Sequence, residues 1–213
     1  MKSFTGFKIP ILFLVLLLPV REIGAQSVSP WENLKAAYAA YVKNPSARNA
    51  KKVSEIVPQC ANPPAGTPGS SSGESAGVSD QEDAEDYLMA HLGTLEKRMK
   101  EGNRASFQLA YQLFSISDGE FSEELAEILD KPIHSNPELF LEELKENQAE
   151  LQQSGRFENL LTFMGPQFAD QAGQPLKEYQ SRIRALRKVR KASLKTFRDQ
   201  CIDVIHNEFI HAE

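Results

Sequence analysis

Beyond residue 25 the sequence contains no apolar run long enough to cross a bilayer, which takes roughly 20 residues. It also lacks a basic excess, because 24 Lys and Arg stand against 29 Asp and Glu and give a formal net charge of -5. A general nucleic-acid-binding protein usually carries a strong basic excess, so this balance argues against that class. No window alternates apolar and polar residues between hairpin turns. A β-sheet is therefore not expected, and the chain is predicted to be all-α.

Motifs for covalent, metal or cofactor chemistry are missing or misplaced. Gly69 to Gly73 has the spacing of a serine-hydrolase elbow, but it lies in low-complexity sequence with no strand before it. His206 and His211 are five residues apart, whereas a zinc-binding pair on one helix face is four apart. His91 falls among apolar positions and is expected to be a core histidine with one satisfied nitrogen. No catalytic, cofactor-binding or metal-binding residue is therefore assigned.

Residues 1–25 have the order of a secretory signal peptide. Lys2 and Lys8 accompany the apolar run Ile11 to Leu18, and small residues precede a cleavage expected after Ala25. The run is too short to anchor the protein in a bilayer. We expect a secreted or periplasmic protein that is soluble and has no membrane span once this leader is removed.

Cys60 and Cys201 are the two cysteines of the chain. Export brings a protein into an oxidising environment, and this favours a disulfide between them. The chain-entropy model gives such a long loop a stabilisation on the order of 4 to 5 kcal/mol. The alternative is that both are separate small residues of the core.

An N-terminal helical hairpin is predicted over residues 26–60. Ser29 can cap its first helix and Pro30 fits the first turn, while Pro58 is expected to end its second helix. Residues 61–82 contain the stretch NPPAGTPGSSSGESAGVS, which cannot bury enough apolar surface to offset the entropy of ordering it. This segment is interpreted as a flexible linker.

Residues 83–213 form the predicted helical body. A helix from Asp83 to about Lys100 is followed by a series of cap and turn signals. These signals are Gly102, Asn103, Ser117 to Gly119, Pro132 as a helix end, Asn136-Pro137, Gly155 and Gly165-Pro166. No Gly or Pro follows Pro175, so one long C-terminal helix is predicted to lie across several shorter ones.

The helix pairs between Asn103 and Met164 are predicted to form antiparallel hairpins joined by short turns. In helix length and turn placement this part, about a third of the chain, resembles α-helical repeat proteins of the HEAT type, although no repeat consensus is present. The expected fold is an all-α arrangement of antiparallel helical hairpins, either a bundle or a short HEAT-like helical array, with a long C-terminal helix.

The middle of the predicted body is strongly acidic. Its carboxylates are Asp118, Glu120, Glu123, Glu124, Glu127, Asp130, Glu138, Glu142, Glu143, Glu146 and Glu150. Paired carboxylates can do acid/base work, but one of them must then lie in a desolvating pocket. This many glutamates at helix-surface positions indicate a solvated face instead. His134 is expected in a loop, with no specific role.

The predicted C-terminal helix carries an apolar stripe and a neighbouring basic stripe. The apolar stripe consists of Ile183, Leu186, Leu194, Phe197, Cys201, Val204 and Ile205. Arg190 projects into it, and we expect its stem to pack while its head reaches water at the edge; the alternative is a partly buried arginine paired with a carboxylate. The basic stripe consists of Arg184, Arg187, Lys188, Lys191, Lys195 and Arg198. It is expected to complement the acidic middle of the same chain, or else to bind an external anionic partner.

These observations favour a non-enzymatic, exported helical protein that acts as an interaction or scaffold module for another macromolecule. The expected partner is a protein, with an anionic surface as a further possibility and nucleic acid disfavoured by the charge balance. Two alternatives stay open. One is an enzyme whose Glu and His residues meet only on folding, and the other is a module that binds anionic surfaces through the basic stripe.

Overall fold

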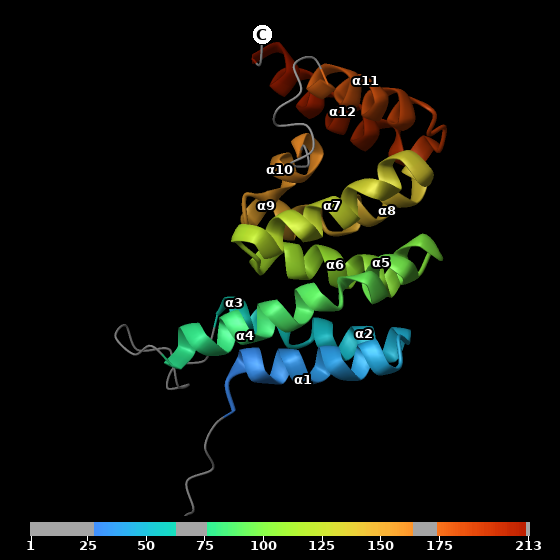
Figure 1. Ribbon diagram of the computed structural model, residues 1–213. Coiled ribbons are helices and arrows are strands. Elements are labelled where there is room, and N and C mark those ends of the chain that lie inside the picture. The colour runs from blue at the N-terminus through green and yellow to red at the C-terminus, as the bar shows by residue number, and fades with distance from the viewer. Residues whose placement is uncertain (1–27, 63–75, 164–173, 212–213) are drawn as a thin grey trace, which may run out of the picture.

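A computed structural model describes residues 28–62, 76–163 and 174–211 of the chain. Every regular element in these ranges is a helix, which confirms the all-α prediction. The helices stack one upon another, with α1 at one end of the stack and α12 at the other (Figure 1). Within the same ranges, no helix is both long and apolar enough to cross a membrane.

The first three helices are α1 (Pro30–Lys43), α2 (Ala47–Ser54) and α3 (Val57–Ala61). The predicted cap is confirmed, because the Ser29 hydroxyl accepts a hydrogen bond from the Glu32 backbone N–H at 3.1 Å. The prediction that Pro58 ends a helix is wrong. Pro58 lies in the first turn of α3, where backbone N–H groups have no partner inside the helix and a missing one costs nothing.

The N-terminal helices pack directly on the rest of the protein. Helix α1 contacts α4 (Ala76–Ala90), while α2 and α3 contact α6 (Arg104–Ile116). A single cluster of buried apolar side chains runs from Leu34 in α1 to Ile205 in α12. Helix α4 begins inside the segment 61–82 that was interpreted as a linker, and residues 63–75 lie outside the described ranges.

The middle of the stack contains α5 (Leu92–Lys100), α7 (Gly119–Ser135), α8 (Pro137–Glu146), α9 (Gln148–Gln153) and α10 (Arg156–Thr162). The predicted helix from Asp83 to Lys100 is interrupted at His91. The prediction that Pro132 ends a helix is also wrong, because α7 continues through it to Ser135. Proline removes only one backbone hydrogen bond there, and burial of Pro132 and Ile133 holds the last turn in place.

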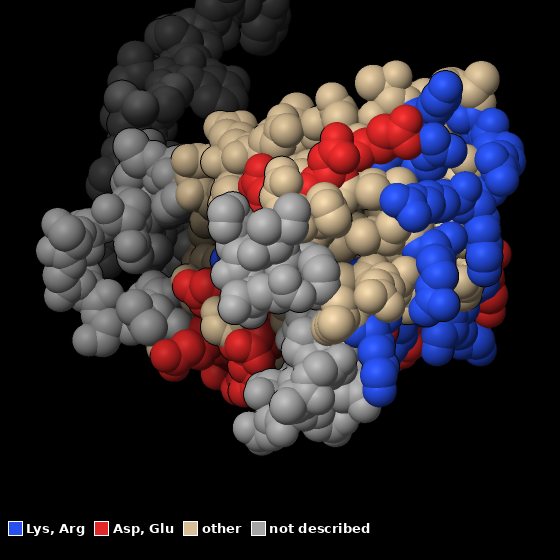
Figure 2. Space-filling model, turned by 90° about the horizontal axis from the view of Figure 1, so that it is seen from above, with Lys and Arg blue, Asp and Glu red and all other residues tan. Residues whose placement is uncertain are grey.

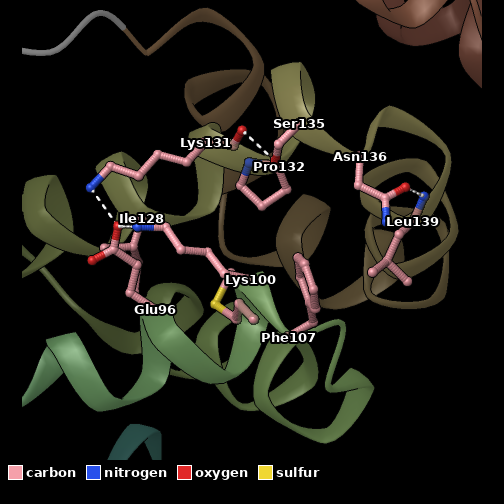
Figure 3. A pocket seen from close by; sticks show the side chains of 10 residues that line it. Glu96, Lys100, Phe107, Ile128, Lys131, Pro132, Ser135, Asn136 and Leu139 are labelled. Atoms are coloured by element: carbon pink, nitrogen blue, oxygen red, sulfur yellow. Dashed lines mark hydrogen bonds and ion pairs between the residues drawn. The ribbon is translucent and has the colours of Figure 1, made fainter.

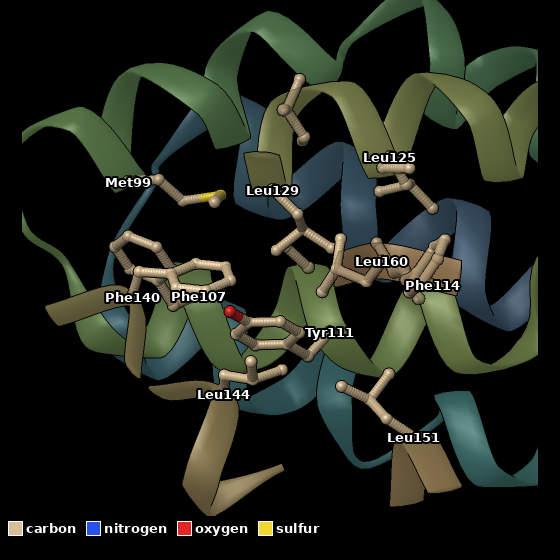
Figure 4. Close-up of a cluster of buried hydrophobic side chains, with 14 of the residues drawn as sticks. Met99, Phe107, Tyr111, Phe114, Leu125, Leu129, Phe140, Leu144, Leu151 and Leu160 are labelled. Atoms are coloured by element: carbon tan, nitrogen blue, oxygen red, sulfur yellow. The ribbon is translucent and has the colours of Figure 1, made fainter. Parts of the chain in front are cut away.

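The centre of the core lies between α6 and the helices that follow it (Figure 4). Its buried side chains are Phe107, Tyr111 and Phe114 from α6, Leu125 and Leu129 from α7, Phe140 and Leu144 from α8, Leu151 from α9 and Leu160 from α10. Helix α6 therefore contributes large apolar groups to several neighbours at once, as its dense apolar sequence indicates.

The prediction of one long C-terminal helix is wrong. Helices α11 (Gln174–Arg187) and α12 (Lys195–His211) are joined by a short turn and pack side by side (Figure 1). On one straight helix, Val189 and Leu194 would project about 140° apart. The turn lets both be buried, with exposed fractions of 4% and 3%. A local Gly or Pro is not needed when burial on both sides of the turn favours the break.

The predicted disulfide between Cys60 and Cys201 is also wrong. Both cysteines are buried and unpaired. Cys60 lies on α3, which packs on α1, α2 and α6, whereas Cys201 lies on α12, which packs on α8, α10 and α11. The two thiols therefore belong to opposite ends of the stack (Figure 1). Burial raises the pKa of each thiol to about 12, in keeping with two separate core residues.

Three sequence features fall outside the described ranges, so the structure neither supports nor contradicts them. They are the predicted leader of residues 1–25, the Gly69 to Gly73 spacing and the Gly165-Pro166 stop.

Candidate binding surface

The most cationic segment of the chain surrounds the turn between α11 and α12. No Asp or Glu occurs from Tyr179 to Arg198. Seven of its Lys and Arg residues reach the surface and are called the cationic patch: Arg184, Arg187, Lys188, Arg190, Lys191, Lys195 and Arg198. Seen from the α12 end of the stack, Lys and Arg side chains gather along one edge of the molecule (Figure 2).

The patch stands on a well-packed turn. Leu186, Val189, Leu194 and Phe197 are all buried beneath it. The Arg198 guanidinium closes the turn by donating a hydrogen bond to the Val189 carbonyl at 2.8 Å. The cationic side chains therefore project from a scaffold whose backbone is held by core packing, which lowers the entropy lost when a partner binds.

Three members of the patch have partners within the chain. Lys191 forms an ion pair with Glu142 on α8. Arg198 pairs with its neighbour Asp199 at 2.6 Å. The Nε of Arg184 donates to the Gln180 carbonyl at 3.2 Å.

The other four members are exposed and form no ion pair with any residue that the structure describes. They are Arg187, Lys188, Arg190 and Lys195. Their charges face solvent and are free to meet an external anion.

The structure brings together the six residues predicted as a basic stripe, but they surround the turn between α11 and α12 and do not lie along one continuous helix. Within the described ranges, Lys191 is the only one of the six that forms an ion pair with the acidic middle of the chain. Lys145 on α8 also contacts the turn, because its Nζ donates a hydrogen bond to the Ser193 carbonyl at 3.1 Å. Arg190 is exposed, and within the described ranges it is not the partly buried, carboxylate-paired arginine of the alternative prediction.

The buried arginine of this region is Arg182, which the sequence did not single out. It is 1% exposed, and its guanidinium lies 3.0 Å from Asp130 on α7 and 3.2 Å from Glu178 on α11. It also donates to the Leu161 carbonyl at 3.0 Å. Glu178 precedes it by one helical turn, a spacing visible in the sequence, but Asp130 comes close only through folding.

His134 completes this cluster, because its Nε2 lies 2.8 Å from a Glu178 carboxylate oxygen. It sits in the last turn of α7 and not in a loop. Ligand atoms of Asp130, His134 and Glu178 lie within 4.8 Å of one another, close enough to suggest a metal site. However, the Arg182 guanidinium already supplies the positive charge between the two carboxylates. The cluster is therefore a structural ion-pair network that ties α11 to α7.

Two carboxyl groups in the acidic middle of the chain are less exposed to solvent than the sequence predicts. Burial raises the pKa of Asp130 to about 6, with Arg182 opposing the shift. Burial raises the pKa of Glu143 to about 7, although Arg104 lies 2.7 Å away and opposes it. Asp130 and Glu143 lie on different helices and each is paired with its own arginine. They do not form a carboxylate pair.

A comparison of the chain with protein-family models, with curated proteins and with solved structures found no match.

Proposed function

We propose that this protein is an interaction module that binds an acidic surface of another protein through the cationic patch. The observation that carries the proposal is the density of the patch: seven surface cations surround one packed turn, and four of them have no ion-pair partner in the described ranges. Arginine suits such a role, because its planar guanidinium can bind a carboxylate through two parallel hydrogen bonds.

The surface chemistry favours a protein partner over a lipid bilayer. Helices that lie on membranes bury large apolar side chains next to their cationic ones. Among the described residues, Val28 is the one large apolar side chain that is strongly exposed, and it precedes α1 at the opposite end of the stack. The patch therefore offers positive charge and hydrogen-bond donors, but no large exposed apolar side chain that could insert into a bilayer.

Nucleic acid is disfavoured for a related reason. Proteins that bind single strands combine cationic grooves with aromatic side chains on which bases stack. Phe197 beneath the patch is 3% exposed and Tyr179 is 7% exposed, so neither aromatic ring is available for stacking.

The alternative hypothesis of an enzyme with a Glu and His site receives less support. Such a site needs a perturbed carboxyl group that is open to substrate. Asp130 and Glu143 have raised pKa values, but arginine side chains occupy the positions beside them.

The test is a binding measurement with a defined acidic polypeptide. Poly-glutamate labelled with a fluorophore is titrated with the chain lacking residues 1–25, and anisotropy is recorded at several salt concentrations. We expect saturable binding that weakens steeply with added salt, because exposed charges are screened over about 10 Å at 0.1 M ionic strength. The variant R187Q/K188Q/R190Q/K195Q is expected to lose this binding.

A matched control removes four exposed cations from the other end of the stack, in K43Q/R48Q/K51Q/K52Q. It should bind poly-glutamate as the unmodified chain does. Equal losses in both variants would show that only net charge matters and would refute a specific patch. Stronger binding to anionic phospholipid vesicles than to poly-glutamate would overturn the choice of a protein partner.

A further inference from the structure

A partly enclosed cavity of about 370 Å³ opens between α5, α7 and α8 (Figure 3). Ligand pockets for small molecules start at roughly this size. Its wall is mainly apolar and is formed by Met99, Phe107, Ile128, Pro132 and Leu139. These side chains come from α5, α6, α7 and α8, so four helices shape the cavity together.

Core packing holds most of the cavity wall in place, and one flexible side chain, Met99, can adjust to a ligand. Met99, Phe107 and Ile128 are at most 5% exposed, because their other faces belong to the core. A methionine in such a wall adjusts to apolar groups of different shape. Pro132 has no N–H to donate, so the usual helical hydrogen bond to the Ile128 carbonyl is missing at the cavity wall.

One end of the cavity carries charge. Lys100 and Lys131 both lie 2.9 Å from the same carboxylate oxygen of Glu96. Lys131 is also 3.2 Å from Glu127. An ammonium group has three N–H donors, and these contacts use one on Lys100 and two on Lys131. Lys100, whose side chain is 63% exposed, therefore keeps most of its donors for another acceptor.

The two remaining polar side chains of the cavity differ in the hydrogen-bonding groups that they keep free. The Ser135 hydroxyl donates to the Lys131 carbonyl at 3.2 Å. The Asn136 side-chain oxygen accepts from the Leu139 backbone N–H at 3.3 Å and caps α8, which leaves its NH₂ group as a donor. The free donors of the rim are therefore the Asn136 NH₂ group and Lys100, and an anionic acceptor gains most from Lys100 because that hydrogen bond is charge-assisted.

We propose that this cavity binds a small amphipathic carboxylate, with its apolar chain against Phe107, Ile128 and Leu139 and its carboxylate at Lys100. The inference is independent of the proposed function, because no residue of the cavity belongs to the cationic patch.

The experiment is isothermal titration of the chain with three ligands of equal chain length, each kept below its micelle concentration. They are decanoate, the neutral 1-decanol and the cationic decyltrimethylammonium. We expect decanoate to bind at one site and more tightly than the alcohol, with the cation weakest. The patch variant R187Q/K188Q/R190Q/K195Q should bind decanoate unchanged, which separates this site from simple attraction to the patch.

Two variants locate the site. Lys100→Glu should weaken decanoate binding by about tenfold or more, the loss expected for one charge-assisted hydrogen bond. Lys97→Glu, on the exposed face of the same helix and outside the cavity, is the matched control and should leave binding unchanged. Leu139→Trp, at a half-buried position, should fill the cavity and abolish binding of both decanoate and decanol.

The proposal is overturned if decanoate shows no saturable binding, if the cationic ligand binds as well as decanoate, or if Lys100→Glu and Lys97→Glu behave alike. Circular dichroism of each variant establishes that a lost signal comes from the site and not from unfolding.

Discussion

At the scale of single residues, buried polar groups fall into two kinds. Tyr41 is fully buried, and its hydroxyl lies 2.9 Å from the Ser106 hydroxyl. Tyr111 is equally buried in the centre of the core, yet its hydroxyl has no hydrogen-bond partner among the described residues. An unpaired buried hydroxyl loses its hydration and gains nothing in exchange, so these two tyrosines should respond differently to the same substitution.

Tyr111→Phe is expected to leave the free energy of unfolding unchanged or to raise it, because it removes an unsatisfied polar group and keeps the ring. Tyr41→Phe should lower it by about 1 kcal/mol, the usual net contribution of a hydrogen bond. Urea unfolding of both variants provides the comparison. A loss at Tyr111 as large as that at Tyr41 would show that the Tyr111 hydroxyl has a partner after all.

Residue roles that depend on sequence neighbours could be predicted, and those that depend on folding could not. Ser29, Asn103 and Asn136 were identified as helix caps, and each accepts the expected backbone hydrogen bond. The pairing of Arg182 with Asp130 was missed, because one partner lies on α11 and the other on α7. No local pattern distinguishes that arginine from its exposed neighbours.

At the scale of helices, the presence of a helix was easier to predict than the residues at which it begins and ends. The sequence predicts a helix end at Pro58 and at Pro132, but proline is compatible with a first turn and, at the cost of one hydrogen bond, with a well-packed last turn. The break between α11 and α12 contains neither Gly nor Pro. Its cause is tertiary, namely the burial of Val189 and Leu194 on opposite sides of the turn.

A pair of glycines tests the local backbone argument. Gly155, between α9 and α10, has a φ of +70° and open space around an added Cβ, so Gly155→Ala should cost about 1 to 2 kcal/mol through the backbone alone. Gly93 lies inside α5 with equally open space, so Gly93→Ala should stabilise by about 0.4 to 1 kcal/mol. Thermal unfolding should move the two midpoints in opposite directions. A shift of the same sign in both would contradict the assigned backbone conformation of Gly155.

At the scale of the whole molecule, the sequence supported an all-α fold but not the order of packing. Helical periodicity and short turns indicated stacked helices, and the absence of alternation excluded a sheet. It could not show that α2 and α3 pack on α6, because that contact bridges a segment of low-complexity sequence. Nor could it show that the two cysteines end up far apart.

The separation of Cys60 and Cys201 leads to a test of the entire arrangement. Mass spectrometry of unreduced protein should find two free thiols, and a thiol reagent should modify both only after unfolding, because both are buried. Adding a reductant should leave the unfolding midpoint unchanged. A mass that corresponds to an intramolecular disulfide would mean that the ends of the stack approach each other and would contradict the fold.

Helix α1 and the α11–α12 turn lie at opposite ends of one uninterrupted core. Packing along this core therefore sets the distance between the two ends. Whatever is joined ahead of α1 and whatever touches the α11–α12 turn are held apart by the whole height of the molecule, at a separation that packing sets and that no flexible tether could keep constant.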